Sequence, residues 1–247
     1  MSHALITGGQ QGIGLGIAQA LAGAGVRLTL VSEQPEDAPA VTAALDRLPA
    51  DTRYLRHDLA RIADIGALLD AVGPVTTLVS NAGVPAMRRG DLLEMQPDSF
   101  DRCMAVNLRG SFFLAQAVAR RMLAEPTEGY RSLIFVTSVS AVMASPERAE
   151  YCISKAGASM MAQTFALRLA PEGIGVFELR PGIIATPMTE GVRDRYDARI
   201  SGGLVPAGRW GEPADIGRVV LPLVRGEMDF ATGTAIAVDG GLSIPRL

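Results

Sequence analysis

Tyr151 and Lys155 are the residues whose types and spacing point most directly to chemistry. They lie four positions apart at the start of the helical pattern over 151–170, so they share one face of a predicted helix. A tyrosine pKa of about 10 is too high for a base at neutral pH, and a nearby ammonium lowers it by favouring the phenolate. We therefore expect Tyr151 to exchange a proton with a carbonyl or alcohol oxygen. The alternative is a surface pair that happens to be one turn apart.

Ser138 follows the apolar run 133–137 and is placed to hydrogen-bond the same oxygen and orient a substrate. Ser140 either contacts the substrate or only belongs to the loop. Cys152 neighbours Tyr151, but no His/Asp partner that would activate a nucleophile is evident. We therefore interpret Cys152 as a packing residue.

A glycine-rich turn over 7–14 is the second chemical feature. It follows the apolar run 4–6 and precedes apolar residues at helical spacing, so it joins a strand to a helix. Glycine permits a tight turn and close approach of a phosphate, and the helix N-terminus beyond it favours a pyrophosphate. No Lys follows Gly14, which argues against a nucleoside triphosphatase. The alternative is a loop that only permits close packing.

Short apolar runs alternate with longer helical patterns along the chain. The predicted strands are residues 4–6, 28–31, 53–55, 77–80, 133–137, 176–179 and 235–238. Helical patterns follow the glycine turn and lie near 37–48, 61–72, 98–124, 151–170 and 213–225. This alternation predicts an α/β fold, a single Rossmann-type doubly wound domain over 1–247 with a seven-stranded parallel sheet and helices on both faces.

Polar or glycine residues stand where each of the first six predicted strands ends. In open parallel sheets, ligands bind beyond the carboxyl ends of the strands. Beyond the glycine turn, the residues at these ends are Ser32, Glu33, Asp58, Asn81, Ala82, Gly83, Ser138, Pro181 and Gly182. The sequence therefore predicts a ligand crevice along this edge.

The segment 188–211 looks like an excursion from the sheet, and we expect it to form a substrate lid. Its arginines, Arg193, Arg195 and Arg199, either meet an anionic substrate or lie on a solvated helix face with Asp194 and Asp197.

Composition narrows the functional class. The chain has 247 residues, of which 48% are hydrophobic, enough for a sizeable core. A net charge of −3 without long runs of one sign suggests neither nucleic acid nor an anionic membrane as a partner. Two separated cysteines and two histidines make a metal site improbable, and the cysteine usage fits a reducing, cytoplasmic setting.

Together these residues resemble the short-chain dehydrogenase/reductase family over nearly the full length of the chain. The motifs are Thr7-Gly8-x-x-x-Gly12-Ile13-Gly14, Asn81-Ala82-Gly83, Asn107, Ser138, Tyr151-x-x-x-Lys155 and Pro181-Gly182-x-x-x-Thr186. Each motif is short, but their shared order and spacing are specific.

The resemblance implies a role for each matching position. It implies that Tyr151 is the acid/base, that Ser138 orients the substrate, and that Lys155 binds the nicotinamide ribose and lowers the tyrosine pKa. It further implies that Asn107 places a water in a proton relay through Lys155; facing solvent is the alternative. The expected cofactor-binding residues are Gly8, Gln11, Gly12, Ile13, Gly14, Ser32, Glu33, Asp58, Leu59, Asn81, Ala82, Gly83, Tyr151, Lys155, Pro181, Gly182, Ile184 and Thr186. For Asp58, a turn or helix cap is the alternative.

The resemblance implies an NAD(P)-dependent oxidoreductase that interconverts a carbonyl and a secondary alcohol by hydride transfer. The chain is most similar to the 3-oxoacyl-thioester reductase branch, while the charged loop 145–150 also suits a sugar, polyol or other hydroxylated substrate. Other classes left open are a non-catalytic dinucleotide-binding sensor and a dehydratase or epimerase on the same fold. The resemblance also implies a homotetramer, which apolar residues in 102–123 and 156–169 would allow.

Cofactor choice depends on the end of the second predicted strand. Glu33 lies 21 positions after Gly12, close to the roughly 20 expected for an acidic residue that accepts from the ribose 2′-hydroxyl. A 2′-phosphate would instead favour Arg or Lys, and none occurs between Leu28 and Val41. We predict NAD(H) over NADP(H), with a solvent-facing Glu33 and a permissive Ser32 as the alternative.

Overall fold

The computed structural model describes residues 2–125 and 128–246, and within them seven strands form one sheet. The strand order is β3-β2-β1-β4-β5-β6-β7, and every neighbouring pair is parallel. The strands are β1 (His3–Thr7), β2 (Arg27–Ser32), β3 (Arg53–Arg56), β4 (Thr77–Ser80), β5 (Arg131–Val136), β6 (Ile174–Pro181) and β7 (Ala235–Val238). The predicted Rossmann-type sheet is confirmed.

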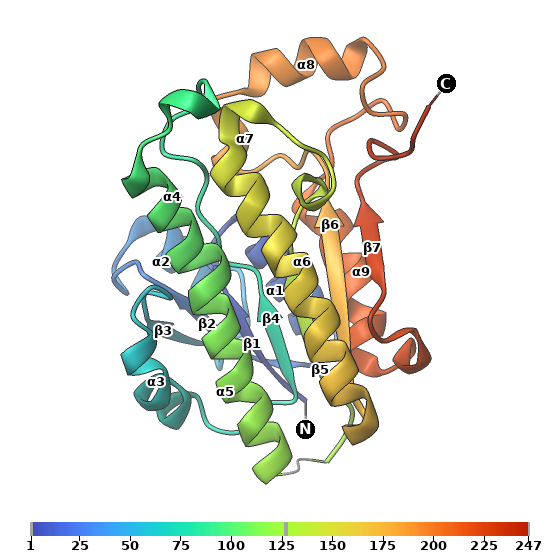
Figure 1. The fold of residues 1–247 in the computed structure, drawn as a ribbon. Coiled ribbons are helices and arrows are strands. Elements are labelled where there is room, and N and C mark those ends of the chain that lie inside the picture. Colours follow the sequence, from blue (N-terminus) through green and yellow to red (C-terminus); the bar gives the residue numbers. More distant parts are fainter. Residues whose placement is uncertain (1, 126–127, 247) are drawn as a thin grey trace.

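Helices cover both faces of the sheet (Figure 1). On one face α1 (Gly12–Gly23) and α9 (Pro213–Arg225) share a core with the strands. On the other face lie α3 (Ile65–Val72), α5 (Ser111–Ala124) and α6 (Ala149–Leu169). The remaining α-helices are α2 (Pro39–Leu45), α4 (Pro97–Cys103), α7 (Pro187–Glu190) and α8 (Arg193–Ser201).

Strand residues alternate between these two cores. Along β5, Leu133 and Phe135 enter the core beneath α5 and α6, while Ile134 and Val136 enter the core beneath α1 and α9. All four side chains are buried. A strand covered on both faces must be apolar at every position, which is why this sheet could be recognised from continuous apolar runs.

Two glycines bring α1 and α9 into close contact. A Cβ atom on Gly16 would lie 2.6 Å from the Pro213 carbonyl oxygen, and one on Gly217 would lie 2.6 Å from the Gly16 carbonyl oxygen. Only glycine fits at either position. The contact fixes the helix that carries the glycine turn at its N-terminus.

The single helical pattern expected over 98–124 is wrong in detail. The chain forms α4, then a π-helix over Met104–Gly110, then α5. Asn107 lies in the π-helical segment, and its side chain bonds outside its own helix. Gly110 also packs tightly, because a Cβ there would lie 2.2 Å from the Leu59 carbonyl oxygen. The π-helical segment thus carries tertiary contacts at Asn107 and Gly110. The spacing of apolar residues along the chain does not reveal such contacts.

Other boundaries differ by a few residues. β6 extends two residues beyond the expected 176–179 at each end, and α2 is shorter than the expected 37–48. The segment 188–211 contains α8, which lies beyond the carboxyl ends of the strands at the top of Figure 1.

Within the described residues, no helix has the length and apolarity needed to span a bilayer. The same residues contain no group of three His, Cys, Asp or Glu arranged to hold a metal.

Candidate active site

Two cavities meet at Tyr151 beyond the carboxyl ends of the strands. The first, of about 400 Å³, is called the cofactor cavity here, and the second, of about 390 Å³, the substrate cavity. Tyr151, Ile13 and Thr186 line both. The cofactor cavity is lined by these predicted residues: Gly8, Gln11, Gly12, Ile13, Ser32, Glu33, Asp58, Leu59, Asn81, Ala82, Gly83, Tyr151, Lys155 and Thr186. Four more predicted residues line the substrate cavity: Ser138, Pro181, Gly182 and Ile184.

The glycine turn has the backbone that its composition predicts. Gly8 and Gly12 have φ angles of +66° and +53°, a region that favours glycine. Asn81 at the end of β4 holds the turn, because its side-chain amide donates to the Thr7 carbonyl oxygen over 2.9 Å. Gly14 lines neither cavity; a Cβ there would lie 2.1 Å from the Gly8 carbonyl oxygen. Gly14 therefore shapes the turn rather than the cavity wall.

Side chains from β3 contact the residues at the end of β2 that line the cofactor cavity. Ser32 is buried, and its hydroxyl lies 2.6 Å from the Tyr54 hydroxyl, so it is already engaged within the protein. Arg56 reaches across and donates from Nε to the Glu33 carbonyl oxygen over 2.9 Å. The expectation that no cation lies near this end is therefore wrong, because strand pairing supplies one from 24 residues beyond Ser32.

Asp58 closes a turn, the alternative considered for it, and also stands in the wall of the cofactor cavity. Its Oδ1 accepts a 2.9 Å hydrogen bond from the Ala60 N–H, which closes a turn, and the residue also lines the cofactor cavity. His57, next to it, is buried, and its Nε2 has no hydrogen-bond partner among the described residues. Burial lowers the pKa of His57, so its imidazole is neutral near pH 7.

Lys155 and Tyr151 lie together as predicted, but the electrostatics differ from the expectation. Lys155 Nζ donates to the Val136 carbonyl oxygen over 3.1 Å and lies 5.8 Å from the centre of the Tyr151 ring. Burial lowers the pKa of Lys155 to about 8. Burial also raises the pKa of Tyr151, opposed by a hydrogen bond with Ser138 and by the charge of Arg148. A net lowering of the tyrosine pKa was therefore the wrong expectation, because desolvation is the larger effect here.

Asn107 is buried, so the solvent-facing alternative is wrong. Its Oδ1 accepts from the Val84 N–H over 2.7 Å, and its Nδ2 donates to the Val84 carbonyl oxygen and the Ser154 hydroxyl, each over 3.0 Å. It lines neither cavity. Asn107 therefore ties the chain after β4 to α6 beside Lys155.

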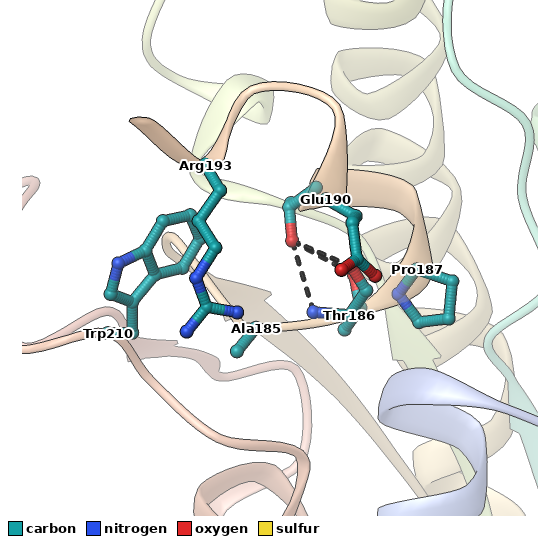
Figure 2. A pocket seen from close by; sticks show the side chains of 7 residues that line it. Ala185, Thr186, Pro187, Glu190, Arg193 and Trp210 are labelled. Carbon is teal, nitrogen blue, oxygen red and sulfur yellow. Dashed lines mark hydrogen bonds between the residues drawn. The ribbon is translucent and has the colours of Figure 1, made fainter. Parts of the chain in front are cut away.

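Thr186 begins the short helix α7. Its N–H donates to the Thr189 hydroxyl over 3.1 Å, and the two side chains form a reciprocal cap. A third cavity, of about 240 Å³, lies against Thr186, with Trp210 and Arg193 along one side (Figure 2). The Arg193 guanidinium lies 5.7 Å from the Trp210 ring centre, outside the substrate cavity. The cap fixes Thr186 where the two larger cavities meet.

Several residues at the site were missed from the sequence. Gln10 and Arg102 line the cofactor cavity, and Gln10 Oε1 is buried without a partner among the described residues. Arg148 lies 5.5 Å from the centre of the Tyr151 ring. The position of His57, two residues after the predicted strand 53–55, was a usable signal, whereas Arg102 gave none. The unpartnered buried atoms of Gln10 and His57, two residues that line the cofactor cavity, fit a polar dinucleotide.

Comparison with known proteins decides the family. A family model described as enoyl-(acyl carrier protein) reductase matches residues 8–243. The chain belongs to the short-chain dehydrogenase/reductase family. A crystal structure of a 3-oxoacyl-[acyl-carrier protein] reductase from Brucella melitensis in complex with NAD has a TM-score of 0.93 and 49% identity, covering 100% of this chain and 98% of that chain.

Two further relatives carry names of sugar-acid enzymes. The 2-dehydro-3-deoxy-D-gluconate 5-dehydrogenase of Escherichia coli is 33% identical over 246 residues, covering 96% of this chain and 94% of its own. A structure from Agrobacterium tumefaciens described as a 2-deoxy-D-gluconate 3-dehydrogenase with bound NADP has a TM-score of 0.87 and 30% identity, covering 98% of this chain and 96% of that chain. The protein is therefore an NAD(P)-dependent oxidoreductase that interconverts carbonyl and alcohol groups, not a non-catalytic sensor.

Proposed function

We propose that Tyr151 moves the proton in this reaction, at the junction of the cofactor and substrate cavities. The observation that carries the proposal is the position of Tyr151, which lines both cavities. Ser138 lies on the substrate side of Tyr151 and Lys155 on the cofactor side. A group that serves both bound molecules belongs at this junction.

The chain supplies position and the proton. A nicotinamide dinucleotide in the glycine-lined cavity would supply or accept the hydride. Ser138 donates a hydrogen bond to the substrate oxygen, and Tyr151 protonates that oxygen during reduction or removes its proton during oxidation. The Lys155 ammonium, anchored on the Val136 carbonyl, holds ribose hydroxyls and favours the phenolate. Asn107 keeps the chain after β4 and α6 in place and positions a water of the proton relay.

Replacing Tyr151 with Phe tests the assignment. The variant should fold and bind NADH like the parent, because only one hydroxyl is removed. Its turnover should fall by about 10²–10⁴, the usual contribution of a proton-transfer group. Cys152→Ala is the matched control on the same helical turn and should keep parent turnover. Near-parent activity of Tyr151→Phe in both directions would contradict the role.

The pH dependence gives a second test of the same role. Oxidation needs deprotonated Tyr151, so its rate should rise with pH through the apparent tyrosine pKa; reduction should show the opposite trend. An oxidation rate that is flat with pH in single-turnover experiments, where chemistry limits the rate, would exclude Tyr151 as the base.

NAD(H) is the proposed cofactor. Glu33 lines the far end of the cofactor cavity, where a carboxylate accepts from a ribose 2′-hydroxyl and repels a 2′-phosphate. The relative at 49% identity is described in complex with NAD, although the NADP-bound relative and the proximity of Arg56 argue for some use of NADP(H).

A small hydroxylated compound is the proposed substrate class. The substrate cavity of about 390 Å³ has charged and hydroxyl side chains at its wall, and the sugar-acid relatives favour this class. A 3-oxoacyl thioester is the second candidate, favoured by the apolar wall residues Val139, Met143 and Leu204 and by the name of the relative at 49% identity.

Three further features belong to the proposal. Residues 188–211 act as a lid, since Met188, Arg195 and Leu204 from this segment line the substrate cavity. The enzyme is a homotetramer, supported by exposed apolar side chains on α6. Two free cysteines, one of them buried, fit a reducing cytoplasmic setting.

A further inference from the structure

Arginines dominate the charge of the substrate cavity. Arg89, Arg148, Arg195 and Arg199 line it, and among the described lining residues Glu147 is the single carboxylate. The arginines come from three separate segments, the loop after β4, the turn before α6 and the helix α8. A cavity wall with four cations and one anion attracts an anionic ligand.

Two of the four arginines share one face of α8. Arg195 and Arg199 lie four residues apart, one helical turn, and both line the cavity. Arg193 on the same helix packs on Trp210 and does not line it. The two possibilities for the arginines of this helix, anion binding or a solvated face, therefore divide by residue, because Arg195 and Arg199 line the cavity and Arg193 does not.

Glu147 forms an ion pair with one of these arginines, Arg195. Arg195 Nη1 lies 3.2 Å from Glu147 Oε2, with side chains 53% and 45% exposed. An ion pair this exposed contributes little net stability, so a bound carboxylate can replace Glu147 without a large penalty. Glu147 thus acts as an internal stand-in for the anionic group of a substrate.

Ser140 is an independent polar feature in the wall of the same cavity. It is 3% exposed, it lines the cavity, and its Oγ has no hydrogen-bond partner among the described residues. Its N–H donates to the Ser138 hydroxyl over 3.0 Å, so Ser140 lies next to the residue proposed to orient the reacting oxygen. An unpaired buried hydroxyl is unfavourable, and a substrate hydroxyl would satisfy it.

We propose that the substrate is a small hydroxylated acid. Its carboxylate pairs with Arg195 and Arg199 at the lid, and a hydroxyl near the reacting carbon bonds to Ser140. The reacting carbinol then lies between these anchors, beside Ser138 and Tyr151. This inference rests on the proposed function and narrows its substrate class, excluding neutral polyols as the preferred substrates.

Matched pairs of aldonates and alditols test the inference, because members of a pair differ chiefly in one carboxylate. D-Gluconate against D-glucitol is one pair, and pentonates against pentitols supply others. For each compound we would measure kcat/KM with NAD as the cofactor. Calorimetry would give the Kd with which the compound binds to the protein–NADH complex. At least one acid should exceed its alditol by tenfold or more in kcat/KM or in affinity.

Variants assign that preference to named side chains. The double variant Arg195→Ala/Arg199→Ala should reduce the ratio of kcat/KM for an acid to kcat/KM for its alditol about tenfold or more. Arg193→Ala removes one charge from the same helix as a control and should leave this ratio unchanged. Glu147→Gln should lower the KM for acids, since the competing carboxylate is gone. Ser140→Ala should weaken binding of both members of a pair.

The results separate this inference from the proposed function. If no compound reacts but acids bind better than alditols through Arg195 and Arg199, the proposed activity fails and the anion site stands. Equal binding and turnover of acids and alditols would overturn the anion site. The anion site would also be overturned if acetoacetyl-N-acetylcysteamine, a neutral 3-oxoacyl thioester, were turned over far faster than every acid tested.

Discussion

The Glu178 carboxylate accepts a 2.6 Å hydrogen bond from the Thr137 hydroxyl, which ties β6 to the residue before Ser138. Glu178 is 2% exposed and also accepts from the Ser159 hydroxyl on α6 over 2.8 Å. Arg180 completes the cluster, with Nε 2.9 Å from the same carboxylate. The cluster joins the segment carrying Ser138 to the helix carrying Lys155, so it holds both proposed active-site residues in place.

Glu178→Gln should therefore destabilise the protein well beyond an ordinary surface change. Removing one partner of a buried pair leaves the other charge poorly solvated, and we expect a loss of about 2–4 kcal/mol in the free energy of unfolding. Urea denaturation measures it. Glu172→Gln is the control, because its ion pair with Arg168 lies at the surface and should cost less than about 1 kcal/mol. Equal losses for the two variants would show that the Glu178 cluster has no special structural role.

Lys155→Met should make the protein more stable and almost inactive. Lys155 is 5% exposed, and burial lowers its pKa from 10.5 to about 8. Holding a buried ammonium at pH 7 thus costs on the order of 3 kcal/mol, which an apolar side chain avoids.

The stability advantage of Lys155→Met should depend on pH. Between pH 8 and 10.5 the folded parent has released the Lys155 proton while the unfolded chain still holds it. The parent therefore gains stability as pH rises through this window, and the advantage of Lys155→Met should shrink there. Urea midpoints at pH 7 and pH 10 measure the difference. A constant advantage at both pH values would contradict a charged Lys155 as its cause.

The sequence predicted the sheet because buried parallel strands are apolar at every position, as in Leu133 to Val136. Most of the site residues that it predicted line one of the two cavities, and several of these, such as Ser32, Asn81 and Ser138, directly follow predicted strands. It could not predict contacts that depend on pairing between distant segments. The hydrogen bond of Tyr54 with Ser32, for instance, exists because β2 and β3 lie in register.

Two wrong predictions from the sequence also arose because contacts between distant segments and burial could not be seen in it. The π-helix at Asn107 depends on side-chain bonds to Val84 and Ser154, 23 and 47 residues away. The upward shift of the Tyr151 pKa depends on burial, which spacing to Lys155 does not reveal. Helical spacing correctly placed the two residues together, but only the packed structure shows how strongly each is desolvated.

An apolar stripe on α6 should hold subunits together. Ile153, Met160 and Leu167 recur every seven residues and are 51%, 59% and 82% exposed, so they form one line along the helix. Leu167→Arg should shift the protein from a tetramer toward smaller species in sedimentation velocity. Leu93→Arg is the control, because Leu93 is equally exposed but lies in a short turn outside α6. An unchanged sedimentation coefficient for Leu167→Arg would place the interface elsewhere.

Two opposed side chains, Glu33 after β2 and Arg56 on the neighbouring β3, should set the cofactor choice. Glu33 lines the cavity with a carboxylate that repels a 2′-phosphate, and the Arg56 guanidinium, 2.9 Å from the Glu33 carbonyl oxygen, would attract one. The Ser32 hydroxyl is engaged with Tyr54, so it competes little for the ribose. Because the carboxylate also accepts from a 2′-hydroxyl, we predict NAD(H) as the preferred cofactor.

Single substitutions should move that preference in opposite directions. Arg56→Ala should lower kcat/KM for NADP(H) about tenfold and leave NAD(H) nearly unchanged, because a charge-assisted contact to the phosphate is worth about 1.5–3 kcal/mol. Glu33→Ala should raise the use of NADP(H) relative to NAD(H). Arg61→Ala removes an exposed arginine paired with Asp64, outside the cavity lining, and controls for net charge. A parent KM lower for NADPH than for NADH, or an Arg56→Ala variant that loses both cofactors equally, would mean that these two side chains do not discriminate the 2′-position.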